Sequence, residues 1–123
     1  MKILIADNQS KVQHALSVLL KEHSGWSITG YASNTCDLHK KVAEQTPDVL
    51  LMDWGLSSKF HGDFIASLRK LVPGLIIIML STDPEVRQLA MRLRVDFFIS
   101  KVDPPMKLLD VLRDCEKRIT NSV

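Results

Sequence analysis

The hydrophobic and polar positions of this chain form short apolar segments separated by longer amphipathic ones. Residues 3–6, 49–52 and 75–80 are uninterrupted runs of apolar side chains. They lack the alternation of a half-exposed strand, and short continuous runs are typical of parallel strands buried on both faces. Residues 26–32 and 97–100 are weaker strand candidates, and we predict that they lie nearer the sheet edges.

Between the predicted strands, apolar positions recur at helical spacing. The three stripes are Val12, Ala15, Leu16, Leu19 and Leu20; Val86, Leu89, Ala90 and Leu93; and Leu108, Val111, Leu112, Cys115 and Ile119. Shorter helices are predicted around 38–42 and 64–71. We interpret every stripe as core packing. The alternation of strand and helix over 123 residues, without a repeat or linker, predicts one α/β domain with a doubly wound parallel sheet.

Two helices carry start signals. Ser10 with Gln13 resembles a capping box, and Asp103 followed by Pro104 fits an N-cap and a first helical position. Leu109 falls off the apolar stripe of the last helix, which hints at a contact surface, although a single exposed leucine usually has no role.

Composition excludes several classes of protein. With 46% hydrophobic and 24% charged residues, the chain is neither disordered nor collagen-like. The net charge is only +2, and the 16 Lys and Arg are scattered, with adjacent pairs at 40–41, 69–70 and 117–118. Because a nucleic-acid surface normally clusters its basic residues, we expect no direct nucleic-acid binding by this domain.

The spacing of the cysteines and histidines and the length of the apolar runs indicate the cellular compartment in which we expect the protein. Cys36 and Cys115 are far apart, show no metal-ligand spacing and are interpreted as free thiols in a reducing environment. The four histidines are equally dispersed, so no zinc-type site is expected. The chain starts in a strand pattern without a signal peptide, and its longest apolar run, 75–80, is too short to span a bilayer. We expect a cytoplasmic protein without membrane contact.

Polar side chains collect where the predicted strands end. They are Asp7, Asn8, Asp53, Ser81, Thr82 and Lys101. Each alone suits a turn, a cap or a solvated surface. In open α/β sheets, however, ligands bind beyond the carboxyl ends of the strands, and the convergence of these groups on one edge favours a functional site.

This set of side chains has a chemical logic. Oxygen ligands from Asp7, Asn8 and Asp53 suit Mg²⁺, which binds few carboxylates and keeps waters and phosphate oxygens. A carboxylate can also attack phosphorus and form an aspartyl phosphate. The hydroxyl and the ammonium would then hold the phosphoryl oxygens.

Four segments in chain order, ILIADNQ, PDVLLMDWGL, IIIMLST and FFISKVDPP, resemble the strand ends of the receiver domains of two-component response regulators. GWSITGYASN and DPPMKLLDVL are most similar to the NarL/LuxR-type subgroup. The resemblance covers the whole chain. It implies a single receiver domain over 1–123, with a five-stranded flavodoxin-like fold of the receiver type and helices on both faces.

The resemblance also implies roles for individual residues. Asp53 matches the phospho-accepting aspartate, and Asp7 matches the first acid of the acidic pair. Asn8 falls on the second acid, usually a direct metal ligand, and Gly55 falls where the family donates a backbone carbonyl to the metal. Mg²⁺ is the implied cofactor.

The implied switch uses three further positions. Ser81 matches the switch hydroxyl, Lys101 the characteristic lysine, and Phe98 the aromatic that changes rotamer as the hydroxyl moves. The implied function is signal transduction: a histidine kinase or phosphotransfer protein phosphorylates Asp53, which remodels the surface of the fourth helix, fifth strand and fifth helix. An effector domain or a second copy would respond. Either the receiver stands alone or the chain is an excised piece.

Several positions depart from the family pattern. They are Asn8, in place of a carboxylate; Ser57, where proline is common, in a loop over 57–62 that is one residue longer; Thr82, in place of a small residue; and Arg94 and Phe97, where Ala or Gly types are common. These departures leave open a pseudo-receiver, a binding module that works without phosphate. A flavin-binding protein or phosphatase is less favoured, because no Gly-rich loop follows the first strand.

Overall fold

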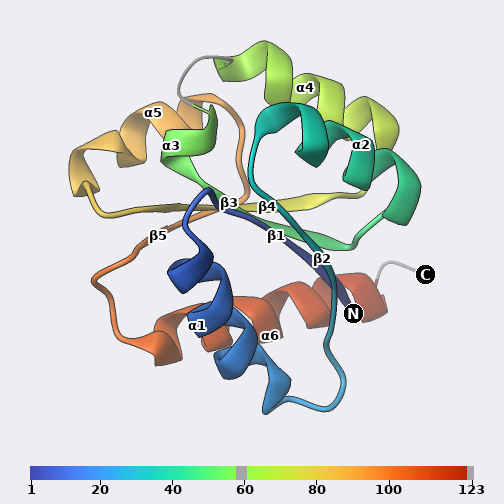
Figure 1. Ribbon diagram of the computed structural model, residues 1–123, viewed down its shortest axis with the longest axis vertical. Helices are drawn as coiled ribbons and strands as arrows, with labels where there is room; N and C mark the ends of the chain where they lie inside the picture. The colour runs from blue at the N-terminus through green and yellow to red at the C-terminus, as the bar shows by residue number, and fades with distance from the viewer. Residues whose placement is uncertain (58–60, 122–123) are drawn as a thin grey trace.

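The computed structural model describes residues 1–57 and 61–121 of the chain. A five-stranded parallel sheet forms its middle layer (Figure 1). The strands are β1 (Lys2–Ala6), β2 (Ser27–Ala32), β3 (Val49–Asp53), β4 (Ile76–Ser81) and β5 (Phe97–Ser100), in the order β2-β1-β3-β4-β5. The sheet is doubly wound as predicted, with both weaker strands at its edges. The strand order reverses between β1 and β3, where this type of sheet opens a crevice.

Helices cover both faces of the sheet (Figure 1). One layer consists of α1 (Ser10–Lys21) and α6 (Pro105–Asn121). The other consists of α2 (Thr35–Gln45), α3 (Trp54–Ser57), α4 (His61–Leu71) and α5 (Arg87–Arg92), which follows the 3-10 turn η1 (Pro84–Val86). No helix within the described ranges is long and apolar enough to cross a membrane.

The sheet separates two hydrophobic cores. Leu4 and Leu50 pack in the core beneath α2 and α4, whereas their neighbours Ile3 and Leu51 pack in the core beneath α1 and α6. All four side chains are at most 1% exposed. Because both faces of the central strands are covered, their sequences are continuously apolar, as the prediction assumed.

The predicted capping box at α1 is wrong. Gln9 is the N-cap, without a side-chain cap, and Ser10 is the first helical residue. The Asp7 carboxylate already closes this turn, since its Oδ1 accepts a hydrogen bond from the Gln9 N–H at 2.9 Å. Gln13 therefore points elsewhere, and its Nε2 donates to the Asp7 carbonyl at 2.6 Å.

The predicted start of the last helix is also wrong by one residue. Helix α6 begins at Pro105, and Asp103 does not serve as its N-cap. Asp103 instead closes the preceding turn, because its Oδ2 accepts from the Ser100 N–H at 3.1 Å and pairs with Lys107 at 3.1 Å. The carboxylate is thus used in the loop that follows β5.

Two expectations about helical side chains need correction. Leu109 is half-buried and packs against the core beneath α1 and α6, so it is not an exposed contact residue. In the predicted stripe over 86–93, only Ala90 is buried, while Leu89 is 49% exposed. Leu93 is half-buried and packs against the core beneath α2 and α4, so two of the four side chains of this stripe contribute to core packing.

Candidate functional site

The carboxyl edge of the sheet brings two acids and one lysine into direct contact. Asp7 follows β1, Asp53 ends β3, and Lys101 follows β5. The Lys101 Nζ lies 2.9 Å from Asp7 Oδ2 and 2.7 Å from Asp53 Oδ1. One ammonium therefore bridges both carboxylates across the crevice between β1 and β3.

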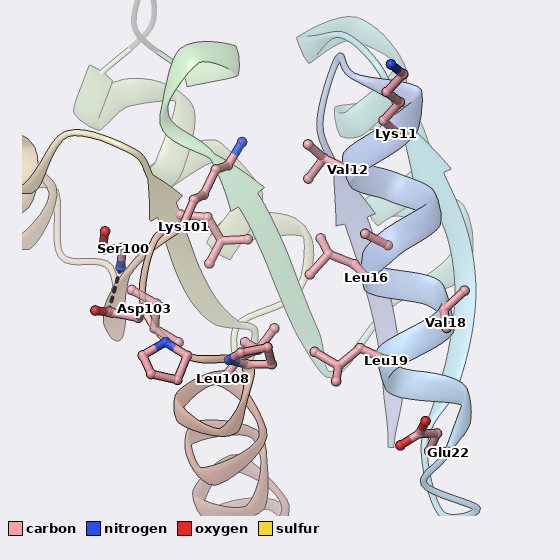
Figure 2. A pocket seen from close by; sticks show the side chains of 15 residues that line it. Lys11, Val12, Leu16, Val18, Leu19, Glu22, Ser100, Lys101, Asp103 and Leu108 are labelled. Atoms are coloured by element: carbon pink, nitrogen blue, oxygen red, sulfur yellow. Dashed lines mark hydrogen bonds between the residues drawn. The ribbon is translucent and has the colours of Figure 1, made fainter.

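The strand ladder positions Lys101 for this bridge. Its backbone N–H donates to the Ser81 carbonyl at 2.7 Å and so extends the β4–β5 pairing by one residue. From this point, its aliphatic stem crosses the end of β4 toward β3. Figure 2 shows the side chain extending along the end of β3 and away from α6.

Backbone groups hold both carboxylates. Asp7 is 1% exposed, and its Oδ1 receives the Gln9 N–H described above. Asp53 Oδ2 accepts the Gly55 N–H at 3.1 Å. A Cβ at Gly55 would lie 2.9 Å from that same oxygen, so a larger residue at this position would displace the Asp53 carboxylate.

The charges at this edge stabilise one another. Burial by itself lowers the pKa of Lys101, but the hydrogen bonds and charges of Asp53 and Asp7 outweigh it, and the net pKa is raised above 10.5. Lys101 is consequently protonated throughout the physiological range. It offsets the repulsion between two carboxylates that share one crevice.

The oxygen groups beside this bridge fit a hard cation. The Asp7 and Asp53 carboxylates are close enough for one ammonium to contact both, and the exposed Asn8 follows Asp7 directly. Across the described residues, no group of three or more His, Cys, Asp or Glu side chains could hold a metal ion. Two carboxylates with an amide and a backbone carbonyl match Mg²⁺, which takes few protein ligands, better than a zinc-type cage.

Ser81 lies at the same edge, buried to 5% exposure at the end of β4. Its Oγ accepts a hydrogen bond from the Asp83 N–H at 3.0 Å, and the Asp83 carboxylate accepts from the Glu85 N–H at the start of η1. Among the described residues, this hydroxyl donates no hydrogen bond, so its proton is available for another acceptor. Thr82, which lies between Ser81 and Asp83 in the sequence, is exposed.

Phe98 occupies the neighbouring strand. It pairs in register with Met79, two residues before Ser81 along β4, and its half-buried ring packs on the core beneath α2 and α4. Phe97 faces the opposite core, with the Arg118 guanidinium 4.8 Å from its ring centroid. Phe98 is therefore the aromatic residue of β5 on the same side of the sheet as α5.

A mainly apolar groove adjoins the site. It has a volume of about 570 Å³ and lies between α1 and α6. In Figure 2, Val12, Leu16 and Leu19 project into it from α1, opposite Leu108 of α6, and Lys101 forms part of its wall. The carboxyl edge thus continues into an open surface on the α1 side.

The structure brings together Asp7, Asp53, Lys101 and the Gly55 backbone, with Asn8 and Ser81 at the same edge. Of the predicted longer loop, residues 58–60 lie outside the described residues. Sequence reasoning did not identify Gln13, which ties α1 to the Asp7 backbone, or the hydrogen bond from the Gly55 N–H to Asp53.

Comparison with known proteins identifies the family. Residues 3–113 match the model of the response regulator receiver domain. The chain belongs to this family. Among curated relatives, it is 33% identical over 81 residues to a protein-glutamate methylesterase/protein-glutamine glutaminase of Hydrogenovibrio crunogenus, covering 66% of this chain and 21% of that protein. It is 38% identical over 53 residues to the oxygen regulatory protein NreC of Staphylococcus aureus, covering 43% and 24%.

A solved receiver domain shares the fold. The isolated REC domain of RcsB from Salmonella enterica serovar Typhimurium, determined with phosphomimetic BeF3⁻, superposes with a TM-score of 0.83 at 20% identity, covering 95% of this chain and 88% of that chain. The receiver fold predicted from the sequence is confirmed. The chain spans only about a fifth to a quarter of the curated relatives named above.

Proposed function

We propose that this receiver domain transduces a signal by accepting a phosphoryl group on Asp53. The observation that carries the proposal is the single Lys101 ammonium in contact with both Asp7 and Asp53 at the carboxyl edge. An acid pair bridged by a cation, with a hydroxyl at the next strand end, has the groups that phosphoryl transfer to a carboxylate needs.

Asp53 acts as the nucleophile in the proposed reaction. One carboxylate oxygen attacks the phosphorus of a phosphohistidine, the P–O bond forms, and the P–N bond breaks with its electron pair leaving on the imidazole nitrogen. The Lys101 ammonium and the Gly55 N–H orient the two oxygens of Asp53. The Asp53 side chain is 15% exposed, which leaves one side of the carboxylate open to the phosphoryl donor.

Mg²⁺ is the proposed cofactor, held by the Asp7 and Asp53 carboxylates, the Asn8 amide oxygen and the Gly55 carbonyl. When bound, it neutralises charge on the phosphoryl oxygens. Asn8 supplies an oxygen but no charge. A unit charge about 4 Å away is worth roughly 4 kcal/mol at an effective dielectric constant near 20, so we expect weaker Mg²⁺ binding than with an acid at this position.

The proposed output is a change in surface. Once Asp53 carries a phosphoryl group, the Ser81 hydroxyl donates its proton to a phosphoryl oxygen, and Lys101 pairs with another. Movement of Ser81 makes room for the Phe98 ring to turn inward, which alters the surface formed by α5, β5 and α6. The phosphoryl group thus biases a two-state element by local charge.

The proposed partners follow from this reaction. A histidine kinase or phosphotransfer protein supplies the phosphoryl group, and an effector domain or a second copy reads the altered surface, without direct nucleic-acid binding by this domain. Two free thiols, Cys36 and Cys115, agree with a reducing cytoplasmic location. We propose that residues 1–123 act as one receiver domain.

Acetyl phosphate tests the proposal. The protein is incubated with Mg²⁺ and acetyl phosphate, and covalent phosphate is measured by intact mass. The Asp53→Asn variant should show no adduct, whereas Asp110→Asn, which removes an exposed carboxylate 69% accessible on α6, should behave as wild type. If wild type gains no phosphoryl group over a wide range of Mg²⁺ concentration, the proposal fails in favour of a phosphate-independent binding module.

A further inference from the structure

Four cationic side chains meet around one pocket at the opposite edge of the sheet from Asp53. Arg69 and Lys70 come from the last turn of α4, Arg92 ends α5, and Arg94 follows two residues later. The pocket has a volume of about 470 Å³. These residues are scattered along the sequence, and the fold brings them together at this surface.

Most of this positive charge is not neutralised by acids. Asp96 Oδ2 holds Arg69 at 2.8 Å and also accepts the Ile77 N–H at 2.8 Å, which fixes that guanidinium in place. Among the described contacts, no hydrogen bond or ion pair engages the side chains of Lys70, Arg92 or Arg94. The pocket thus combines one fixed arginine with three available cations.

Arg94 has an unfavourable backbone conformation. Its φ is 66°, in the left-handed region, and its N–H donates to the Met91 carbonyl at 3.1 Å to close the end of α5. Glycine is the usual residue at such a position because it has no Cβ to strain. An arginine in a backbone conformation that favours glycine is an outlier, and it points to a role for the side chain.

Favourable placement at helix ends accounts for only part of the cluster. Cations near a helix C-terminus interact well with its exposed carbonyls, which explains Arg69, Lys70 and Arg92 taken singly. It does not explain Arg94, which lies beyond the helix in a strained conformation. The pocket wall also includes the apolar side chains of Ile65 and Leu93, which interactions of cations with helix ends do not require.

We propose that this pocket binds a compact ligand that carries several linked phosphate groups. Arginine forks match phosphate oxygens in geometry and charge, and several cations around one concavity suit a chain of phosphates better than a single anion. The apolar wall can accept an organic group on the same ligand. Such binding would occur far from the proposed phosphorylation site, since Asp96 and Ile77 lie at the amino ends of β5 and β4.

Inorganic tripolyphosphate and ATP are the probes, titrated calorimetrically in Mg²⁺-free buffer with EDTA at constant ionic strength. We expect saturable one-to-one binding of tripolyphosphate. Arg92→Gln and Arg94→Gly should each weaken binding roughly tenfold, the effect of losing one charge-assisted hydrogen bond. Lys11→Gln, which removes an exposed cation from the first turn of α1 on the opposite face of the sheet, should change binding less than about twofold, because a distant surface charge is screened.

The variants separate binding from folding. Arg94→Gly relieves the backbone strain, so its thermal midpoint should be at least that of wild type while its affinity falls. Tighter binding of ATP than of tripolyphosphate would support the role of the apolar wall, and equal binding would support the phosphate chain alone. The proposal is overturned by non-saturable binding, by an equal loss in Lys11→Gln, by a loss in Asp53→Asn, or by tighter binding of a short DNA duplex.

Discussion

Replacing Lys101 with methionine should destabilise the protein by leaving two acids without their shared cation. The side chains of Asp7 and Asp53 are 2% and 15% exposed, and that of Lys101 is 17% exposed. Methionine retains an apolar stem of similar length, so packing is largely preserved. The substitution therefore isolates the charge of the bridge.

The size of the effect follows from the burial of these groups. Removing one partner of a fully buried ion pair costs about 3–5 kcal/mol, and because this edge is partly open we expect about 2–3 kcal/mol. The folded-state pKa of Lys101 is raised above 10.5, so its stabilisation is fully present below pH 10.5 and is lost as pH rises through the higher folded value. This alkaline loss of stability should be smaller in Lys101→Met.

Urea unfolding followed by circular dichroism at pH 7.5 with EDTA measures the change. Lys107→Met is the matched control, because Lys107 is 51% exposed and pairs with Asp103 at the surface, where loss of the pair costs at most about 1 kcal/mol. Mg²⁺ should restore part of the loss in Lys101→Met, by ~1.4 kcal/mol at about ten times its Kd. Equal stabilities of the two variants, or no rescue by Mg²⁺, would refute the bridge as the dominant interaction of these acids.

Three further outcomes are expected. Asn8→Asp should bind Mg²⁺ at least about tenfold more tightly in a fluorescence titration, since it adds a full charge next to the proposed ligands; unchanged affinity would contradict Asn8 as a ligand. Gly55→Ala should lose at most about 1 kcal/mol in urea unfolding, because its Cβ would lie 2.9 Å from Asp53 Oδ2, the end of a side chain that can shift; a larger loss would contradict this reasoning. With iodoacetamide at pH 7.5, exposed Cys36 should react while Cys115 does not, because burial raises the pKa of Cys115 to about 11; rapid loss of both thiols would contradict the buried position of Cys115.

The sheet could be predicted because its central strands are buried on both faces. The runs at 3–6 and 49–52 contain no polar residue that would indicate an exposed face of the strand. The helical stripes between the runs indicate that helices connect the strands, which is typical of parallel strands. Asp7 and Asp53 could be assigned to one edge for the same reason, since parallel strands end together. The convergence of these acids follows from topology rather than from local sequence.

Other features depend on contacts that no local pattern encodes. That Lys101 reaches both acids depends on the path of one side chain across the end of β4. The starts of α1 and α6 were misjudged because Asp7 and Asp103 form hydrogen bonds in the preceding turns. The cationic pocket arises where the C-terminal ends of α4 and α5 meet, and the left-handed conformation of Arg94 is visible only in three dimensions.

Locating the phosphoryl group within the chain tests the central claim most directly. The protein is treated with Mg²⁺ and acetyl phosphate, reduced with borohydride, which converts an aspartyl phosphate to homoserine, digested and sequenced by tandem mass spectrometry. The account predicts homoserine at position 53 in wild type and none in Asp53→Asn or in a sample without Mg²⁺. Homoserine at another aspartate, or an unmodified position 53 after prolonged exposure, would contradict the assignment of this protein as a phospho-receiver through Asp53.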